Sequence, residues 1–226
     1  MPNRREFLAG AASTGLLAAL PIPIDRSLGL HGAERRPFGS VAADETDLTW
    51  VPRLRGASRA VFDSPQVSEG GALFRAALWR KQINSAFGTP VEDVTPVVVF
   101  RHEAIPLVMN DDFWQRMDTG KHIKLRDQNG KKWAKVNPLS GSWAEAPADM
   151  KEFTIPAFIK SGGIVLACGL AFGDIVGQYM KEDKLAKDDA TQRAKEHLIP
   201  GVIIQPSGFF AVLKAQDEGC KYMLGS

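Results

Sequence analysis

Cysteine and histidine are scarce in this chain, and their scarcity excludes several kinds of site. The 226 residues include two cysteines, Cys168 and Cys220, and four histidines. None of them stands at the C-x-x-C or H-x-x-x-H spacing of common zinc sites, and no EF-hand loop occurs, so we expect no metal. The sequence also lacks a G-x-G-x-x-G, a P-loop and a G-x-S-x-G motif. We therefore expect neither a nucleotide cofactor nor a Ser-His-Asp hydrolase.

A large excess of charge of either sign is also missing. The chain has 28 basic and 26 acidic side chains. Residues 1–43 hold five of the basic and three of the acidic ones, which leaves 23 of each in the remainder. A neutral remainder lacks the positive charge with which proteins bind phosphate backbones, so we expect no nucleic-acid partner.

Long apolar runs are missing too, and the longest one lies near the start of the chain. Arg-Arg-Glu-Phe-Leu at residues 4–8 precedes small apolar residues at 9–20. This run is shorter than the roughly 20 residues that span a bilayer, and Pro21 and Pro23 would break a longer helix. The pattern resembles a twin-arginine export signal. We expect residues 1–43 to be that signal and an N-terminal arm, so that the mature protein is periplasmic and has no stable membrane span.

The rest of the chain alternates between two kinds of periodicity. Residues 44–57 read as a linker arm. Short apolar, β-branched runs predict strands, and apolar residues at helical spacing predict helices. The predicted strands are 59–63, 95–100, 163–167, 201–205 and an edge strand at 221–224, and the predicted helices are 70–87, 104–117, 150–160, 170–180, 184–196 and 207–219. Such alternation predicts one α/β domain over residues 58–226 with a mainly parallel, doubly wound sheet.

A polar stretch at about residues 118–146 interrupts this alternation and reads as an insertion. Its segment 127–131, Asp-Gln-Asn-Gly-Lys, is typical of a turn or hairpin tip. Trp114, Trp133 and Trp143 lie in or beside the insertion. They suit a lid over a pocket or a contact between subunits, and ordinary core packing is the alternative.

Cys168 is the main candidate for chemistry. It follows the apolar run at 163–167, and a glycine and a helical pattern come next. The thiol should therefore lie at the carboxyl edge of the sheet, where ligands bind in open α/β folds. Helix N–H groups there favour a thiolate, the reactive form of cysteine. Two alternatives remain, a small buried apolar residue and a disulfide with Cys220.

His102 should lie at the same edge, directly after the strand at 95–100. A histidine there would pair with a thiolate or move a proton, and a solvated loop histidine is the alternative. Asp111 and Asp112 are adjacent and so do not face each other on a helix, which favours a cap or turn over an acid–base pair. Ser207 suits the N-cap of the last helix.

Four stretches of the sequence resemble the DsrE/DsrF-like family of sulfur-relay and sulfur-oxidation proteins, over about residues 58–224. They are Val-Val-Val-Phe-Arg-His-Glu-Ala-Ile-Pro-Leu at 97–107, Gly-Ile-Val-Leu-Ala-Cys-Gly at 163–169, Pro-Gly-Val at 200–202 leading to Ser-Gly at 207–208, and Ala-Gln-Asp-Glu-Gly-Cys-Lys-Tyr at 215–222.

The resemblance implies a flavodoxin-like three-layer α/β sandwich and a homo-oligomer, a trimer or hexamer. It also implies a cysteine that carries a persulfide, and only Cys168 matches that position. The insertion and the export signal depart from the short cytoplasmic members. We therefore expect an exported, thiol-dependent sulfur carrier or sulfurtransferase-like protein that uses Cys168, with His102 as a helper, no cofactor, and a sulfur donor or acceptor protein as partner. The alternative is a periplasmic binding or assembly protein without catalysis.

Overall fold

The computed structural model describes residues 46–127, 130–142 and 152–226, which belong to one unit, Val41–Ser226. The predicted export signal lies outside these residues. In chain order the elements are η2 (Val51–Arg53), β1 (Ser58–Ser64), η3 (Ser68–Gly70), α2 (Gly71–Phe87), η4 (Val91–Asp93), β2 (Val94–Phe100), η5 (His102–Val108), α3 (Asp111–Arg116), α4 (Thr119–His122), α5 (Ile155–Lys160), β3 (Ile164–Cys168), α6 (Gly169–Glu182), α7 (Lys187–Glu196), β4 (Ile203–Gln205), α8 (Gly208–Asp217) and β5 (Lys221–Leu224).

The five strands form one sheet in the order β4-β3-β2-β1-β5, and every neighbouring pair is parallel. This confirms the predicted α/β fold with a parallel sheet. Because all strands run the same way, their carboxyl ends share one edge of the sheet. Among the described residues, no helix combines the length and apolar composition that a membrane crossing requires.

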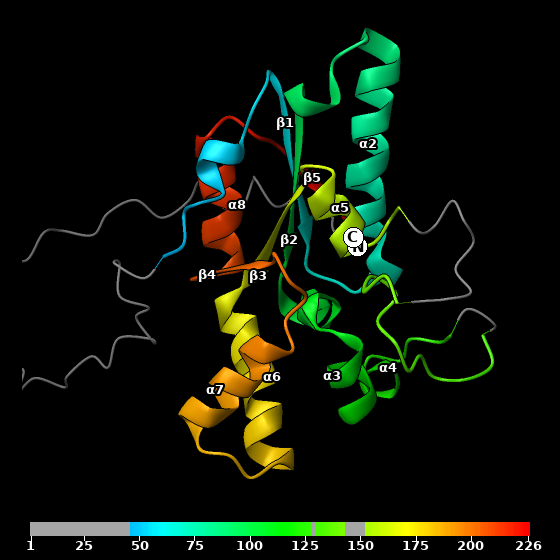
Figure 1. Ribbon diagram of the computed structural model, residues 1–226, viewed down its shortest axis with the longest axis vertical. Coiled ribbons are helices and arrows are strands. Elements are labelled where there is room, and N and C mark those ends of the chain that lie inside the picture. The colour runs from blue at the N-terminus through cyan, green and yellow to red at the C-terminus, as the bar shows by residue number, and fades with distance from the viewer. Residues whose placement is uncertain (1–45, 128–129, 143–151) are drawn as a thin grey trace, which may run out of the picture. The chain divides into compact units, whose positions relative to one another are not determined.

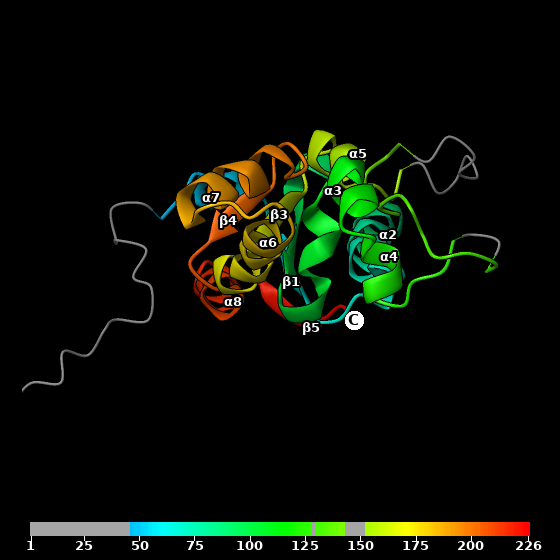
Figure 2. The same cartoon turned by 90° about the horizontal axis from the view of Figure 1, so that it is seen from below.

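Helices cover both faces of the sheet, which explains why the central strands β2 and β3 are buried along their whole length and almost continuously apolar. Successive strand side chains point to opposite faces. Phe62 and Val98 belong to the larger core cluster, together with side chains of α2 and α5. Val61 and Val97 belong to the second cluster, together with side chains of α8. Figures 1 and 2 show α2 and α8 on opposite sides of the sheet, which makes three layers.

The predicted helix at 104–117 is instead two helical segments. The 3-10 helix η5 contains Pro106, which lacks the N–H that an α-helix interior needs. The α-helix α3 then starts afresh at Asn110, whose side chain caps it by accepting from the N–H of Phe113 at 3.1 Å. Asp111 follows this cap, as the cap-or-turn interpretation predicted.

The described part of the predicted linker arm packs onto the domain. Trp50 is fully buried in the core cluster on the α8 side. Its Nε1–H donates to Oε1 of Gln205 at 3.2 Å, and the amide of Gln205 donates to the carbonyl of Asp47 at 2.8 Å. Leu54 joins the same cluster. These contacts tie residues 46–57 to β4 at the edge of the sheet.

The described residues of the insertion pack closely on the domain. The side-chain amide of Asn137, which is fully buried, donates to the carbonyls of Leu107 and Met109 at 2.7 and 2.5 Å. Arg126 and Trp133 form an antiparallel bridge, as a hairpin requires. The centre of the predicted turn at 127–131 and Trp143 lie outside the described residues. A central part of the insertion is therefore ordered structure.

Candidate functional site

The carboxyl edge of the sheet gathers polar side chains from several strands. Asp63 is the last residue but one of β1, Arg101 follows β2, Cys168 ends β3 and Gln205 ends β4. The register pairs Cys168 with Gln205. The helices that follow these last two strands diverge, because α6 packs in the first core cluster and α8 in the second. Cys168 therefore lies where neighbouring connections leave to opposite faces of the sheet, the usual place for a ligand site in such folds.

Cys168 is the N-cap of α6, a helix of 14 residues. Its Sγ accepts a hydrogen bond from the backbone N–H of Ala171 at 3.5 Å. This contact, together with the positive end of the helix dipole, favours negative charge on the sulfur. The residue is only 5% exposed. The predicted position at a strand end and helix start is thus present, and the thiol is buried there.

Gly169 allows β3 and β4 to approach each other directly after Cys168. A Cβ atom on Gly169 would lie 2.6 Å from the backbone oxygen of Gln205, closer than packed atoms come. The close approach of the two strands therefore requires a glycine directly after the cysteine. It fixes the start of α6 and, with it, the N–H groups around the sulfur.

Arg101 forms a paired hydrogen bond with Asp63 at the same edge. Its Nε and Nη2 donate to the two carboxylate oxygens at 2.7 and 2.9 Å. The Asp63 side chain is 4% exposed and that of Arg101 is 32% exposed. The hydroxyl of Tyr222, from β5, also donates to Asp63, at 3.1 Å. Gly208 leaves room for the arginine, since a Cβ there would lie 2.6 Å from its side chain.

The charge of Arg101, which is paired with Asp63, interacts with the thiol of Cys168. The pKa of Arg101 is raised above its ordinary value, chiefly by the hydrogen bonds to Asp63, and the charges of Tyr222 and Cys168 act in the same direction. Burial, followed by the charge of Asp63, raises the pKa of Tyr222. A guanidinium that stays charged thus lies within electrostatic range of Cys168.

His102 lies at the predicted edge, and its side chain is exposed. It starts η5 with a φ of 51°, in the left-handed region. In the parts of the chain that the structure describes, no hydrogen bond or ion pair joins His102 to Cys168. Its neighbour Arg101 is the residue that contacts the buried Asp63 at this edge, and the sequence analysis did not predict a role for it. Two signals were available for it, an arginine directly after a strand and an aspartate at the end of the preceding one.

Cys220 is a free thiol in a different environment. It is buried in the core cluster on the α8 side, and burial raises its pKa to about 11. β3 and β5 are separated by β2 and β1, which amounts to about 14 Å across the sheet. A disulfide requires Cα atoms within about 7 Å. The geometry therefore argues against a bond between Cys168 and Cys220 within one chain.

Trp114 and Asp111 have structural roles in this fold. Trp114 is fully buried, and its Nε1–H donates to the carbonyl of Pro106 at 2.8 Å. The carboxylate of Asp111 accepts from the backbone N–H of Asn137 at 2.8 Å and so anchors the insertion. Within residues 46–127, 130–142 and 152–226, no three His, Cys, Asp or Glu side chains form a group suited to a metal ion.

A scan against protein-family models found no matching family, and a search of curated proteins found no match. The resemblance to the DsrE/DsrF-like proteins therefore stays a prediction from the residues.

Proposed function

We propose that this chain is an exported sulfur carrier of the DsrE-like type, in which Cys168 holds a sulfane sulfur and passes it to an acceptor thiol. One observation carries the proposal. A cysteine sulfur at the carboxyl edge of a parallel sheet accepts an N–H of the following helix and lies within electrostatic range of Arg101. A helix N–H and a guanidinium are groups that bind anions, and the nucleophile in sulfur exchange is an anion, the thiolate.

The proposed step is an exchange between sulfur atoms. The Cys168 thiolate attacks the outer sulfur of a donor persulfide. A new S–S bond forms at Cys168, the S–S bond of the donor breaks, and the donor leaves as a thiolate. The proton on the transferred sulfur stays with it, and no net oxidation or reduction occurs. An acceptor thiolate reverses the step and restores Cys168.

The neighbouring side chains have supporting roles in this proposal. Arg101 is a positioning residue, because its cation favours the anionic sulfur and Asp63 holds it in place. His102 is exposed at the same edge and would protonate the departing thiolate of the donor. Replacing Arg101 with glutamine should slow alkylation of Cys168, and replacing His102 should change the pH dependence of sulfur transfer.

The test is the intact mass of the purified protein after incubation with a low-molecular-weight persulfide. We expect an increase of about 32 Da per sulfur atom, removed by reductant and absent in Cys168→Ser. Cys220→Ser is the matched control, because it removes the other thiol and should keep the modification. Modification that persists in Cys168→Ser, or is missing from the unaltered chain, would contradict the proposal.

The 5% exposure of Cys168 favours a second candidate, a binding or assembly protein without sulfur chemistry. Apolar side chains are exposed on α8 and on the edge strand β5, namely Phe209, Leu213, Met223 and Leu224. An uncovered edge strand with apolar side chains is suited to pairing with another chain. This candidate predicts a homo-oligomer, such as the trimer or hexamer of the resembling family, that Met223→Lys dissociates. Light scattering after size exclusion would measure the change.

Export by the twin-arginine route is part of both candidates. It is supported by the residues at 4–8 and 9–20. Replacing Arg4 and Arg5 with lysine should leave the protein in the cytoplasmic fraction, whereas the unaltered chain should appear in the periplasmic fraction. Equal distribution of the two forms would remove this part of the proposal.

A further inference from the structure

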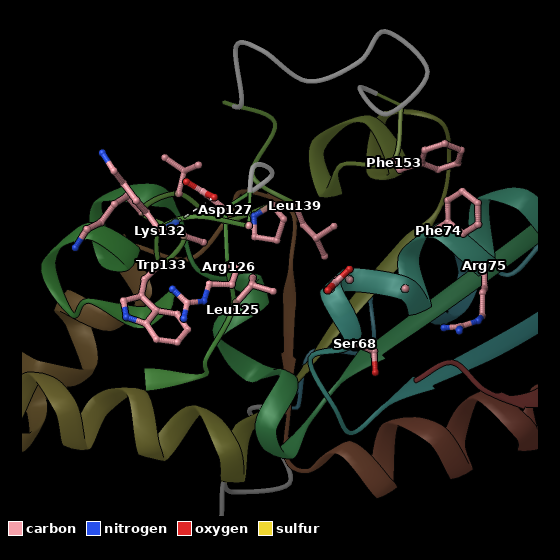
Figure 3. A pocket seen from close by; sticks show the side chains of 18 residues that line it. Ser68, Phe74, Arg75, Leu125, Arg126, Asp127, Lys132, Trp133, Leu139 and Phe153 are labelled. Carbon is pink, nitrogen blue, oxygen red and sulfur yellow. Dashed lines mark hydrogen bonds between the residues drawn. The ribbon is translucent and has the colours of Figure 1, made fainter. Parts of the chain in front are cut away.

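A pocket of about 830 Å³ lies between the start of α2 and the insertion, away from Cys168. Figure 3 shows its two walls. One wall comes from residues 68–75 and Phe153, and the other from the described residues between 125 and 139. The volume is within the range of about 300–1,000 Å³ that is typical of small-molecule sites. Asp63, Arg101 and Cys168 do not line it, so the pocket is separate from the proposed sulfur site.

The inner part of the pocket is apolar. The rings of Phe74 and Phe153 lie with centroids 4.7 Å apart on one wall. Leu139, which is buried, packs against the turn before α2, where a Cβ on Gly70 would lie 2.6 Å from its side chain. Gly70 therefore permits this contact, which joins the two walls. Leu125 and Trp133 complete the apolar lining from the insertion.

The rim of the pocket is cationic. Arg75, Arg126, Lys132 and Lys135 line it, against Glu69 and Asp127. Lys135 pairs with Asp118 at 2.5 Å. The other three cations have no carboxylate partner among the residues that the structure describes, and their side chains are exposed. Cations without a carboxylate partner around an apolar interior suit a ligand that has an apolar part inside the pocket and an anionic group at its rim.

Two of these cations are already held in position. The guanidinium of Arg126 stacks over the ring of Trp133, 3.6 Å from its centroid. Arg75 donates through Nη1 to the carbonyl of Gly225 near the end of the chain. The carboxylate of Asp127 accepts backbone N–H groups of Lys131 and Lys132 at 3.1 and 3.4 Å, which holds it within its own turn. The side chains that remain available at the rim are thus mainly positive.

We propose that this pocket binds a small organic anion with an apolar body, such as a medium-chain or aryl carboxylate or sulfonate. The apolar body lies between Phe74, Leu139 and Trp133. The acid group meets Arg126 and Lys132 at the rim, with Arg75 on the opposite wall. A guanidinium pairs well with a carboxylate or sulfonate because it offers several N–H donors in one plane.

The first test uses 1-anilinonaphthalene-8-sulfonate as a fluorescent probe of the full chain. We expect saturable binding, and weaker binding of N-phenyl-1-naphthylamine, which has the same rings without the sulfonate. Arg126→Gln and Lys132→Gln should each weaken binding of the sulfonate by about tenfold, as the loss of a charge-assisted hydrogen bond does. The same substitutions should leave the neutral probe unaffected.

The controls separate this site from general stickiness and from the sulfur site. Arg55→Gln makes the same charge change at an exposed position before β1, outside the pocket lining, and should bind the sulfonate as the unaltered chain does. Cys168→Ser should also bind normally. Phe74→Ala, with an unchanged near-ultraviolet circular dichroism spectrum, should weaken both probes because it removes part of the apolar wall.

Competition identifies the natural class of ligand. Decanoate should displace the sulfonate and decanol should do so poorly, whereas vesicles containing phosphatidylglycerol should not displace it. Equal binding of the two probes, equal binding by Arg126→Gln and Arg55→Gln, or displacement by the vesicles would each overturn the proposal of an enclosed site for a free organic anion.

Discussion

The substitution Asp63→Asn tests whether the pair between Asp63 and Arg101 organises the carboxyl edge of the sheet. It removes the negative charge from a side chain that is 4% exposed and accepts two hydrogen bonds from Arg101 and one from Tyr222. Breaking a fully buried pair from one side costs about 3–5 kcal/mol. Arg101 keeps access to water, and asparagine keeps one acceptor, so we expect the free energy of unfolding to fall by about 2 kcal/mol.

The assay is chemical and thermal unfolding followed by circular dichroism. A loss of this size lowers Tm by about 4–8 °C in a chain of this length. Asp118→Asn is the matched control, because its carboxylate pairs with Lys135 at the surface and is exposed. That variant should unfold close to the unaltered chain.

A double variant separates the lost attraction from the cost of leaving a cation unpaired. Asp63→Asn with Arg101→Met should recover part of the loss, since the guanidinium is then absent. If Asp63→Asn unfolds as Asp118→Asn does, the pair contributes nothing measurable and the reasoning is refuted. Asp63→Asn should also slow alkylation of Cys168, because Arg101 is then no longer held in place.

Three further predictions concern the elements around the site. Gly169→Ala should lower the free energy of unfolding by about 1–3 kcal/mol, because its Cβ meets the backbone of Gln205. Gly173→Ala, in the same helix with nothing within 4 Å, should raise it by about 0.5–1 kcal/mol, and urea unfolding compares the two. Trp50→Phe should cost about 1–2 kcal/mol in the same assay, since the side-chain oxygen of Gln205 loses its donor, and no change would mean that water replaces it. The pKa of Cys220 is raised from 9.0 to about 11, so the unfolded chain loses this proton first and stability falls as the pH rises from about 9 to about 11. Cys220→Ala should remove this alkaline loss, roughly 2–3 kcal/mol by pH 11, and parallel curves for the two proteins would contradict the assigned cause.

The parallel sheet was predictable because its strands are short, β-branched and separated by helical patterns. Five predicted strands match β1 to β5 within a few residues. The predicted boundaries of the elements were wrong where a proline or a capping side chain overrides the apolar periodicity. Pro106 and the Asn110 cap divide the predicted helix at 104–117. The spacing of apolar residues does not predict that Trp50 packs against β4 at the edge of the sheet.

The position of Cys168 was predictable from its place after a buried strand. Its burial matches one of the two alternatives named for it, and the sequence alone did not decide between them because the neighbours that cover Cys168 come from other parts of the chain. The partnership of Arg101 with Asp63 requires β1 and β2 to be adjacent, and the contact of Tyr222 requires β5 beside β1. Sequence spacing gives neither strand order. His102 was a candidate because histidine exchanges protons near neutral pH. In the fold it is its neighbour Arg101 whose side chain points to the carboxylate of Asp63.

The pocket between α2 and the insertion could not be predicted for a related reason. Arg126, Lys132 and Lys135 come from an insertion without periodicity, and Arg75 lies in α2, far from them in the sequence. The packing of Leu139 against Gly70 joins the two walls. A polar insertion with tryptophans suggested a lid or a contact, and the structure places Trp133 in the wall of a cavity.

The most direct test of the sulfur-carrier proposal is mass spectrometry of the protein isolated from its export compartment, with alkylation and peptide mapping. The account predicts an additional mass of about 32 Da on the peptide with Cys168, removed by reductant, and an unmodified Cys220. A Cys168 that carries no additional sulfur and resists alkylation in the native protein, but reacts after unfolding, would contradict the account and favour the binding or assembly protein.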